Sequence, residues 1–297
     1  MTEEDKPSVT VTLNGDGVIA PALQAIRLAT EMVAVCTSAI EATDLNDLPR
    51  DGFSGLSFVP HADQAKAKLA YRAWILGKAF QELARGLRAT LEQAYIYTLG
   101  LREGRKVETW GEFEDIYLAA EKKASSLNFP DLLLAVQAQL ATKLDFFEEY
   151  RSLQRARNCL EHRNGVVGHI DCDEGAGALS LKLPRLKCST VSDGEEIEVH
   201  KNQYFEKGAT IKIKRDLRIR VFALGETVSF TAEEFSEIAM ALRLSSPTLR
   251  RSCRFRPPEW RWVVGVHACE MGHSNWHCVL RIPISNRRYP MGTMTDE

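Results

Sequence analysis

The chain has 297 residues, and its 44% of apolar and 26% of charged residues are the composition of a globular protein with one large core or two ordinary ones. A formal net charge of −2 argues against a surface built for non-specific duplex binding, because phosphate neutralisation normally leaves a domain visibly basic, although a local basic cleft remains open. The acidic, polar start is unlike a secretory signal, and no stretch reads as a membrane span, so we expect a cytoplasmic protein without membrane contact. Seven scattered cysteines, an odd number, favour free thiols over a disulfide framework.

The first helix is expected to start near Pro21, which suits the first turn of a helix because proline has no backbone N–H to donate. Its apolar stripe predicts that it continues to about residue 43, through Leu23, Ile26, Val33 and Ile40. Residues 1–17 before it are expected to form a flexible tail. A loop rich in turn-forming residues should follow at 45–60.

Three further helices are predicted by apolar residues that recur every three or four positions. They cover residues 62–100, 110–128 and 131–162. The last of them should stop at Asn164 and Gly165, which favour the left-handed conformation that ends many helices.

After Gly165 the apolar period changes from that of a helix to two, which is typical of short half-exposed strands. We expect strands at residues 179–183, 196–199, 210–213 and 218–221. Gly225 should make a turn, and Thr231 should cap a last helix over residues 232–244.

The predicted fold is therefore mainly α: a helical bundle over residues 18–245, with a short-stranded β elaboration at residues 170–230 before the last helix. An irregular tail rich in arginine and tryptophan is expected over residues 246–297.

The stretch Arg-Asn-Cys-Leu-Glu-His-Arg-Asn-Gly, from Arg157 to Gly165, is the part of the sequence that suggests chemistry. Arginine offers a planar, permanently charged fork for a phosphate, and histidine is the side chain that both takes and gives protons near neutral pH. Asn158 and His162 are four residues apart and share a helix face, while Arg157 must reach them from the flank.

Other interpretations of this stretch remain open. Arg157 and Glu161 could form only a solvated i, i+4 pair, with His162 as a C-terminal cap. Arg155 with His162, and Arg163 with His169, also fit a loose Arg–His spacing. The second of these pairs ranks lower, since Gly165 breaks the helix between its members.

The set Arg157, Asn158 and His162 resembles the motif of the HEPN superfamily (higher eukaryote and prokaryote nucleotide-binding), in which an arginine and a polar residue precede a histidine by four to six positions. The resemblance covers the helices between residues 21 and 165, and more weakly the segment 225–230. It implies an antiparallel helical bundle; the strand-rich stretch departs from a minimal domain of this kind.

The resemblance further implies a metal-independent endoribonuclease of a bacterial defence or stress system, of the abortive-infection or toxin–antitoxin type. In such an enzyme the ribose 2′-hydroxyl attacks the adjacent phosphorus and leaves a 2′,3′-cyclic phosphate. Arg157, Asn158 and His162 would be catalytic, and Arg163 and Asn164 would contact the RNA substrate. A homodimer, an antitoxin or other partner protein, and no cofactor or metal are expected.

Two alternatives come from other classes of protein. One is a catalytically silent HEPN-like module for dimerisation, ligand sensing or antitoxin binding, and the other is a structural protein in which the motif is accidental. The sequence lacks a Gly-rich phosphate loop, a Gly-x-Ser-x-Gly elbow and a His-Glu-x-x-His pair, so it offers no residues for the enzymes that use them.

The C-terminal tail gives two weaker signals. Its potential zinc ligands match no known finger or ribbon spacing, so no metal site is expected at His267, Cys269, His273, His277 and Cys278. Its arginines interleave with aromatic residues, a pattern that suits single-stranded nucleic acid but also a solvated extension: Arg250, Arg251, Arg254, Phe255, Arg256, Trp260, Arg261 and Trp262.

Overall fold

The computed structural model describes residues 8–47, 61–103, 107, 109–192, 195–199, 210–252 and 277–283. This part of the chain is mainly helical, with a small three-stranded antiparallel sheet. The elements are β1 (Ser8–Asn14), α1 (Gly15–Ala42), the short 3-10 helix η2 (Leu45–Asp47), α2 (Gln64–Glu103), α3 (Trp110–Ser126), α4 (Phe129–Gln139), α5 (Phe147–His162), β2 (Ala178–Ser192), β3 (Glu195–Glu198), β4 (Ile211–Ala223), α6 (Ala232–Ser252) and β5 (His277–Pro283).

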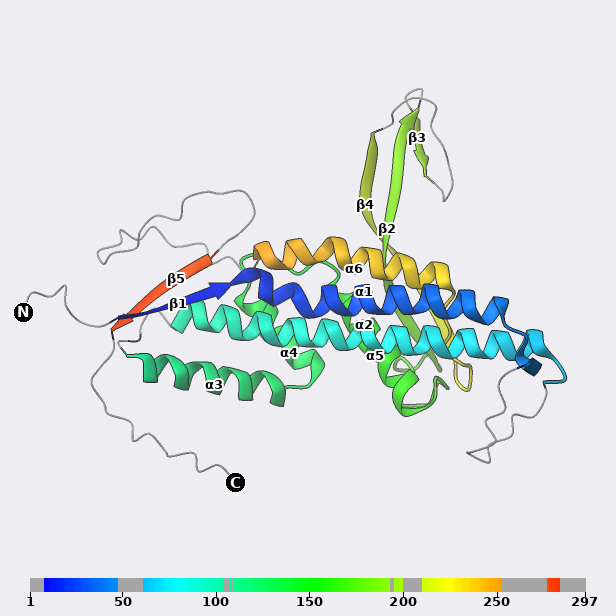
Figure 1. The fold of residues 1–297 in the computed structure, drawn as a ribbon, viewed down its shortest axis with the longest axis horizontal. Helices are drawn as coiled ribbons and strands as arrows, with labels where there is room; N and C mark the ends of the chain where they lie inside the picture. The colour runs from blue at the N-terminus through cyan, green and yellow to red at the C-terminus, as the bar shows by residue number, and fades with distance from the viewer. Residues whose placement is uncertain are drawn as a thin grey trace, which may run out of the picture.

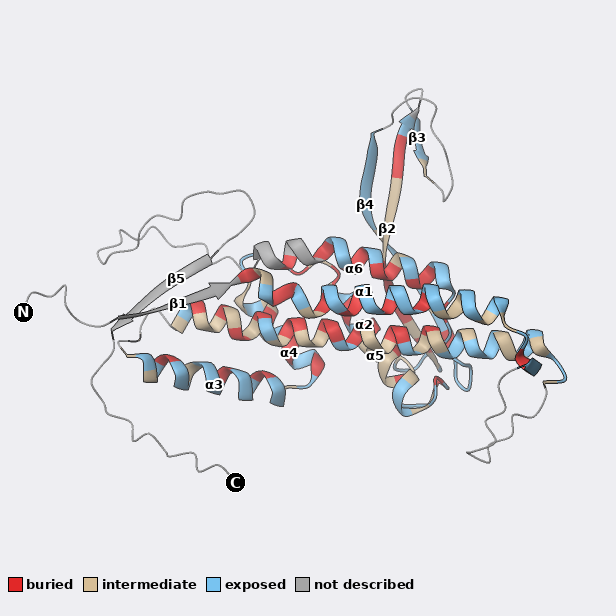
Figure 2. Ribbon diagram, viewed as in Figure 1, coloured by how far each residue is buried: buried red, intermediate tan, exposed pale blue. Residues whose placement is uncertain are grey.

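The long helices α1, α2 and α6 run side by side and form the body of the molecule (Figure 1). Buried residues lie along their contacting faces, as Figure 2 shows, and they join one core that includes Phe80, Leu91, Leu153 and Phe235. That core also receives the buried faces of α4 and α5 and the base of the sheet. The expected bundle of amphipathic helices is therefore present.

The closest approach between α1 and α2 is at Gly86, and it requires a residue without a side chain. A Cβ atom at this position would lie 2.3 Å from the Cβ of Ala25 and 3.0 Å from the carbonyl oxygen of Pro21. Pro21 stands inside α1 and not in its first turn, because the helix already begins at Gly15. One turn further along α2, the hydroxyl of buried Thr90 accepts a 2.9 Å hydrogen bond from the backbone N–H of Ala22.

The single helix expected over residues 131–162 is wrong, because the chain forms two helices there, α4 and α5. The break contains no glycine or proline, and Phe146 adopts a left-handed conformation with φ 61°. Two contacts stabilise the break between the helices. The Oε1 atom of Gln137 accepts a 2.7 Å hydrogen bond from the backbone N–H of Leu144, and Asp145 pairs with Arg215 of β4. The ion pair with Arg215 joins distant parts of the chain, whereas the apolar period continues through the break.

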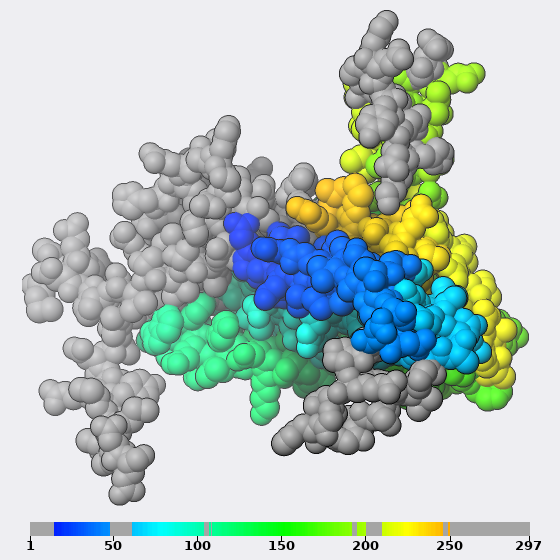
Figure 3. Space-filling view, turned by 45° about the vertical axis from the view of Figure 1, so that its right-hand side comes forward, coloured from blue at the N-terminus to red at the C-terminus, as the bar shows by residue number. Residues whose placement is uncertain are grey.

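The sheet has the order β3-β2-β4, and all its pairs are antiparallel. The two strands expected at residues 210–213 and 218–221 are one strand, β4, because it pairs with β2 continuously from Ile211 to Ala223. At the base of the sheet Leu179, Leu181 and Leu183 are buried against the helices. The far part of β2 and β4 leaves the body of the molecule as a projecting arm (Figures 1 and 3).

Thr231 caps α6 as predicted, and it does so reciprocally. Its hydroxyl accepts the N–H of Glu234 at 3.1 Å, while the Glu234 carboxylate accepts the N–H of Thr231 at 2.9 Å, which makes a capping box. The helix then runs to Ser252, beyond the expected end at residue 244.

The two tails expected at the ends of the chain contain regular structure. Residues 8–14 form β1, residues 15–17 open α1, and β1 pairs antiparallel with β5 over its whole length. The alternation of Val9, Val11 and Leu13 is visible in the sequence, but a strand needs a partner, and this one comes from the opposite end of the chain.

By length and composition alone, α1 could cross a membrane, contrary to the expectation that no segment would qualify. Part of its most apolar window, 39%, is buried inside the bundle, through residues such as Val18, Ile26 and Val33. A core helix passes the same test, so this single helix is weak evidence for a membrane span.

Candidate functional site

The candidate site lies on the outward face of the last two turns of α5. One side of this helix is fixed in the core by Leu153, Ala156 and Cys159, which are at most 1% exposed. The opposite side carries Asn158 and the exposed His162. Acidic residues in the first turn of α5 and His162 in its last turn complement the helix dipole.

The three predicted catalytic side chains lie together. One guanidinium nitrogen of Arg157, Nη1, is 3.2 Å from the Oδ1 atom of Asn158 and 3.5 Å from the Nε2 atom of His162. The contact with His162 is at the outer limit of a hydrogen bond, and it requires Nε2 to accept, because a guanidinium only donates. Arg157 and His162 point in directions about 140° apart around the helix, and the long Arg157 side chain spans this difference.

Gln154, which the sequence did not single out, holds Asn158 in place. Its Nε2 atom donates to the Asn158 Oδ1 atom at 2.9 Å, so this oxygen accepts from both Gln154 and Arg157. The i, i+4 spacing of the two amides was a signal that could have identified this pair.

Arg157 also pairs with Glu161, as the solvated-pair interpretation predicted. The side chains of Arg157 and Glu161 are 30% and 40% exposed, so the pair is open to solvent. A phosphate that binds the guanidinium must therefore compete with an internal carboxylate.

Arg155, the alternative partner for His162, is directed elsewhere. Its guanidinium donates to the carbonyl oxygens of Asp171 and Ser180 and pairs with Asp173 at 2.8 Å. Arg155 therefore joins α5 to the base of the sheet, and the structure gives it no contact with His162 among the described residues.

Arg163, predicted to contact RNA, has an internal partner in Asp171. The Arg163 Nε atom donates to the Asp171 Oδ2 atom at 2.6 Å, and its Nη2 atom pairs with Oδ1, which makes a bidentate ion pair. Asp171 is only 7% exposed and also accepts the backbone N–H of Gly168 at 2.9 Å. The sequence around Asp171 contains no pattern that predicts its ion pair with Arg163.

Asn164 and Gly165 end α5 as predicted, both with positive φ, of 51° and 82°. The N–H of Gly165 returns to the carbonyl oxygen of Cys159 at 3.0 Å, and its carbonyl oxygen accepts the N–H of Val228 at 2.8 Å. The stop therefore fastens the end of α5 to the segment that leads into α6. Asn164 itself is exposed.

Cys159, inside the motif, is not available as a nucleophile. It has no solvent exposure, and burial raises the pKa of its thiol, so the reactive thiolate is disfavoured. Of the other cysteines with described side chains, Cys36, Cys172 and Cys188 are also free.

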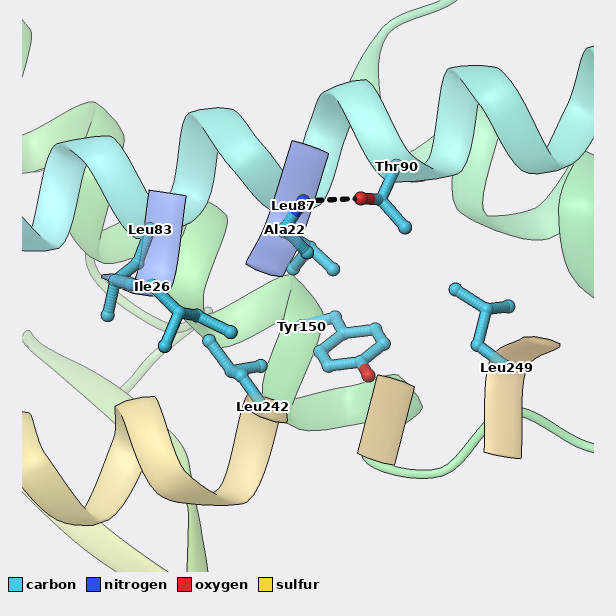
Figure 4. A pocket seen from close by; sticks show the side chains of 8 residues that line it. All are labelled: Ala22, Ile26, Leu83, Leu87, Thr90, Tyr150, Leu242 and Leu249. Atoms are coloured by element: carbon cyan, nitrogen blue, oxygen red, sulfur yellow. Dashed lines mark hydrogen bonds between the residues drawn. The ribbon is translucent and has the colours of Figure 1, made fainter. Parts of the chain in front are cut away.

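A small cavity lies away from the motif, between α1, α2, α5 and α6 (Figure 4). It is comparable in size to a water molecule and mostly apolar, and it is lined by Ala22, Ile26, Leu83, Leu87, Thr90, Tyr150, Leu242 and Leu249. Burial raises the pKa of Tyr150 to about 12, and its hydroxyl lies 3.2 Å from the Ser245 hydroxyl. We interpret this cavity as a packing gap, because it is too small for a substrate.

No group of three or more potential metal ligands lies together in the described parts of the chain. Three of the five tail residues that could bind zinc, His267, Cys269 and His273, fall outside those parts, and His277 and Cys278 open β5. The tail positions from Arg254 to Trp262 are likewise outside the described residues, while Arg250 and Arg251 belong to the end of α6.

Comparison with known proteins found no relative: no protein-family model, no curated protein and no solved structure matches the chain.

Proposed function

We propose that this protein is a metal-independent endoribonuclease, with Arg157, Asn158 and His162 as its catalytic residues. The observation that supports the proposal is that Arg157 contacts both other side chains, within 3.5 Å, on a solvent-exposed helix face. This arrangement places a permanent cation and a proton-transferring group where one phosphodiester could reach both.

The proposed reaction needs few protein groups beyond these three side chains. The imidazole of His162 takes the proton of the ribose 2′-hydroxyl as this oxygen attacks phosphorus, or returns a proton to the leaving 5′-oxygen. Arg157 stabilises the charge that develops on the phosphoryl oxygens, and Asn158 orients the guanidinium. The products are a 2′,3′-cyclic phosphate and a 5′-hydroxyl.

One copy of the motif supplies one imidazole, whereas the reaction uses both a base and an acid. The homodimer implied by the HEPN resemblance would bring a second His162 to the same cleft. In this proposal Arg163 holds the loop after α5 through Asp171, and the exposed Asn164 contacts the RNA. A bacterial defence or stress system with an antitoxin partner is the biological setting that the resemblance implies.

The test is cleavage of single-stranded RNA by the purified protein in EDTA, with the product ends mapped for cyclic phosphate. We expect wild type to cut, and His162→Ala and Arg157→Ala each to lose at least about 100-fold in rate. The matched control is His169→Ala, since His169 is also exposed and lies seven residues further along. Equal rates in wild type and His162→Ala, or loss of activity in EDTA, would contradict the proposal.

The second candidate is a catalytically silent HEPN-like module that senses a ligand or binds a partner. It is favoured by the Arg157–Glu161 pair, which occupies the guanidinium that catalysis would need. This candidate predicts no RNA turnover by wild type, and a nucleotide or partner protein retained on purification through a surface that Arg157→Ala disrupts.

A further inference from the structure

The sheet, from its base to the projecting arm that β3 and the far parts of β2 and β4 form, has two chemically different faces. Successive residues of a strand point to opposite sides, so the register assigns each side chain to one face. Along β4 the residues at odd positions from 211 to 221 share a face, and all but one of them are apolar. Thr190 of β2 pairs with both Ile211 and Ile197, which places Ile197 of β3 on the same face.

These side chains form an apolar stripe that is exposed to solvent. Its members and their exposed fractions are Ile197 43%, Ile211 51%, Ile213 52%, Leu217 42%, Ile219 57% and Val221 60%. A strand with one solvated face normally turns its apolar residues inward and its polar residues outward. In β4 the pattern is reversed: Arg218 and Arg220 point to the side where they meet Glu234 of α6.

The charges of the arm are largely neutralised within the chain. On the opposite face Lys214 pairs with Glu196, and Lys187 pairs with Glu198. The cation that interrupts the stripe, Arg215, pairs with Asp145 of the bundle. β4 is therefore a poor phosphate site, because four of its five cations have carboxylate partners and only Lys212 has no ion pair with a described residue.

The apolar surface is large enough to matter for association. If fully covered, the six side chains of the stripe would remove roughly 600 Å² per chain from water, which is the size of the largest apolar patches on soluble monomers. Two stripes packed face to face would bury roughly 1,200 Å² in total, the lower end of stable protein interfaces.

We propose that this sheet is a homodimerisation element, in which the apolar stripes of two copies of this chain pack against each other. The stripe fits its own copy because it is apolar almost throughout, so that a two-fold axis brings few charges together. Sheets pack face to face at about 10 Å, and the arm projects from the body of the molecule, so a second arm can approach. Lys182, beside Ile219 at the base, lies at the rim of this contact.

The proposal is tested on the full chain by sedimentation equilibrium over a concentration series. We expect wild type to form a dimer, and Ile213→Lys and Ile219→Lys each to raise its Kd at least about tenfold. The control is Lys212→Gln, on the opposite face of the same strand, which should leave the Kd unchanged. Thermal unfolding followed by circular dichroism, at a concentration where every variant is monomeric, should be the same for all variants, since the substituted side chains are exposed.

A wild type that stays monomeric over the whole series would overturn the proposal. A dimer that both stripe variants leave intact would overturn it as well, because association would then use another surface, such as the helices near the motif. Neither result depends on RNA cleavage, so this proposal and the proposed nuclease activity can fail separately.

Discussion

At the scale of single residues, Arg157 lies between two partners with opposite consequences. Its contact with His162 assembles the proposed catalytic pair, while its ion pair with Glu161 occupies the charge that a phosphate would use. Exposed ion pairs contribute only about 0.2–1 kcal/mol, so Glu161 can be displaced at small cost.

Replacing Glu161 by glutamine should therefore strengthen RNA binding by about two- to fivefold, because the guanidinium loses its competing carboxylate. The measurement is fluorescence anisotropy with a labelled RNA whose 2′-hydroxyls are methylated, so that it cannot be cut. Glu148→Gln is the matched control, since Glu148 forms a similar exposed pair with Arg151 earlier on the same helix. An unchanged affinity in Glu161→Gln would show that Arg157 does not contact the RNA.

Thr90 is a second residue whose role is local and specific. Its hydroxyl satisfies the N–H of Ala22 in the turn that follows the start of α1, beside Pro21. Thr90→Val keeps the shape but removes this hydrogen bond between α1 and α2, which should lower the free energy of unfolding by about 0.5–1.5 kcal/mol in urea titrations. Thr30→Val is the control, because its hydroxyl bonds only to its own helix at Ile26, and we expect it to change stability little.

At the scale of secondary-structure elements, two of the three glycines of α2 should respond in opposite ways to replacement by alanine. Gly86 faces α1, where a Cβ would collide with Ala25 and the Pro21 backbone, atoms that cannot rotate away. Gly77 has only the flexible end of Leu160 nearby, at 3.6 Å.

Gly86→Ala should destabilise the protein by about 1–3 kcal/mol, because the two helices must separate to admit the methyl group. Gly77→Ala should be neutral or stabilising by up to about 1 kcal/mol, since alanine favours the helix and its methyl fits. Both are measured by chemical unfolding. The same loss of stability in both variants would contradict the close packing of α1 on α2 at Gly86.

At the scale of the whole molecule, Glu234 joins the start of α6 to the base of the sheet. It caps α6 through Thr231 and pairs with Arg218 and Arg220 at the base of β4. Burial raises the pKa of its carboxyl, but the backbone hydrogen bond of Thr231 and the two arginines outweigh this, and its net pKa is lowered from the usual 4.5.

A lowered pKa in the folded state means that Glu234 stabilises the protein above the unfolded-state pKa and loses this contribution as the pH falls through the folded-state value. Glu234→Gln should therefore cost about 2–4 kcal/mol at neutral pH, and the difference from wild type should shrink below about pH 4.5. Urea unfolding at several pH values measures both. A difference that stays constant down to acid pH would contradict a charged role for Glu234.

The sequence predicted the helices well where periodicity and capping agreed. The ends of α3, the Thr231 cap and the stop at Gly165 follow from local rules of backbone hydrogen bonding. It also brought Arg157, Asn158 and His162 into one candidate site, because neighbours on a single helix are fixed by helix geometry.

The errors share one cause, which is that they depend on contacts between residues far apart in the chain. The break before α5 is held by Asp145 on Arg215, and β1 exists because β5 pairs with it. Asp171, the internal partner of Arg163, is a different case: it is only eight residues away, but it lies beyond the helix stop, where no periodicity predicts the direction of the chain.

The sequence by itself thus determined the helical character of this protein and which side chains of α5 lie together, since both follow from interactions within a few residues. Only the tertiary structure decided that Arg163 is paired internally, that Glu234 joins helix to sheet, and that β4 turns its apolar residues to solvent. The physical reason is that burial and ion pairing depend on which distant segment packs against an element. The pattern of residues along one strand does not show which of its two faces another segment will cover.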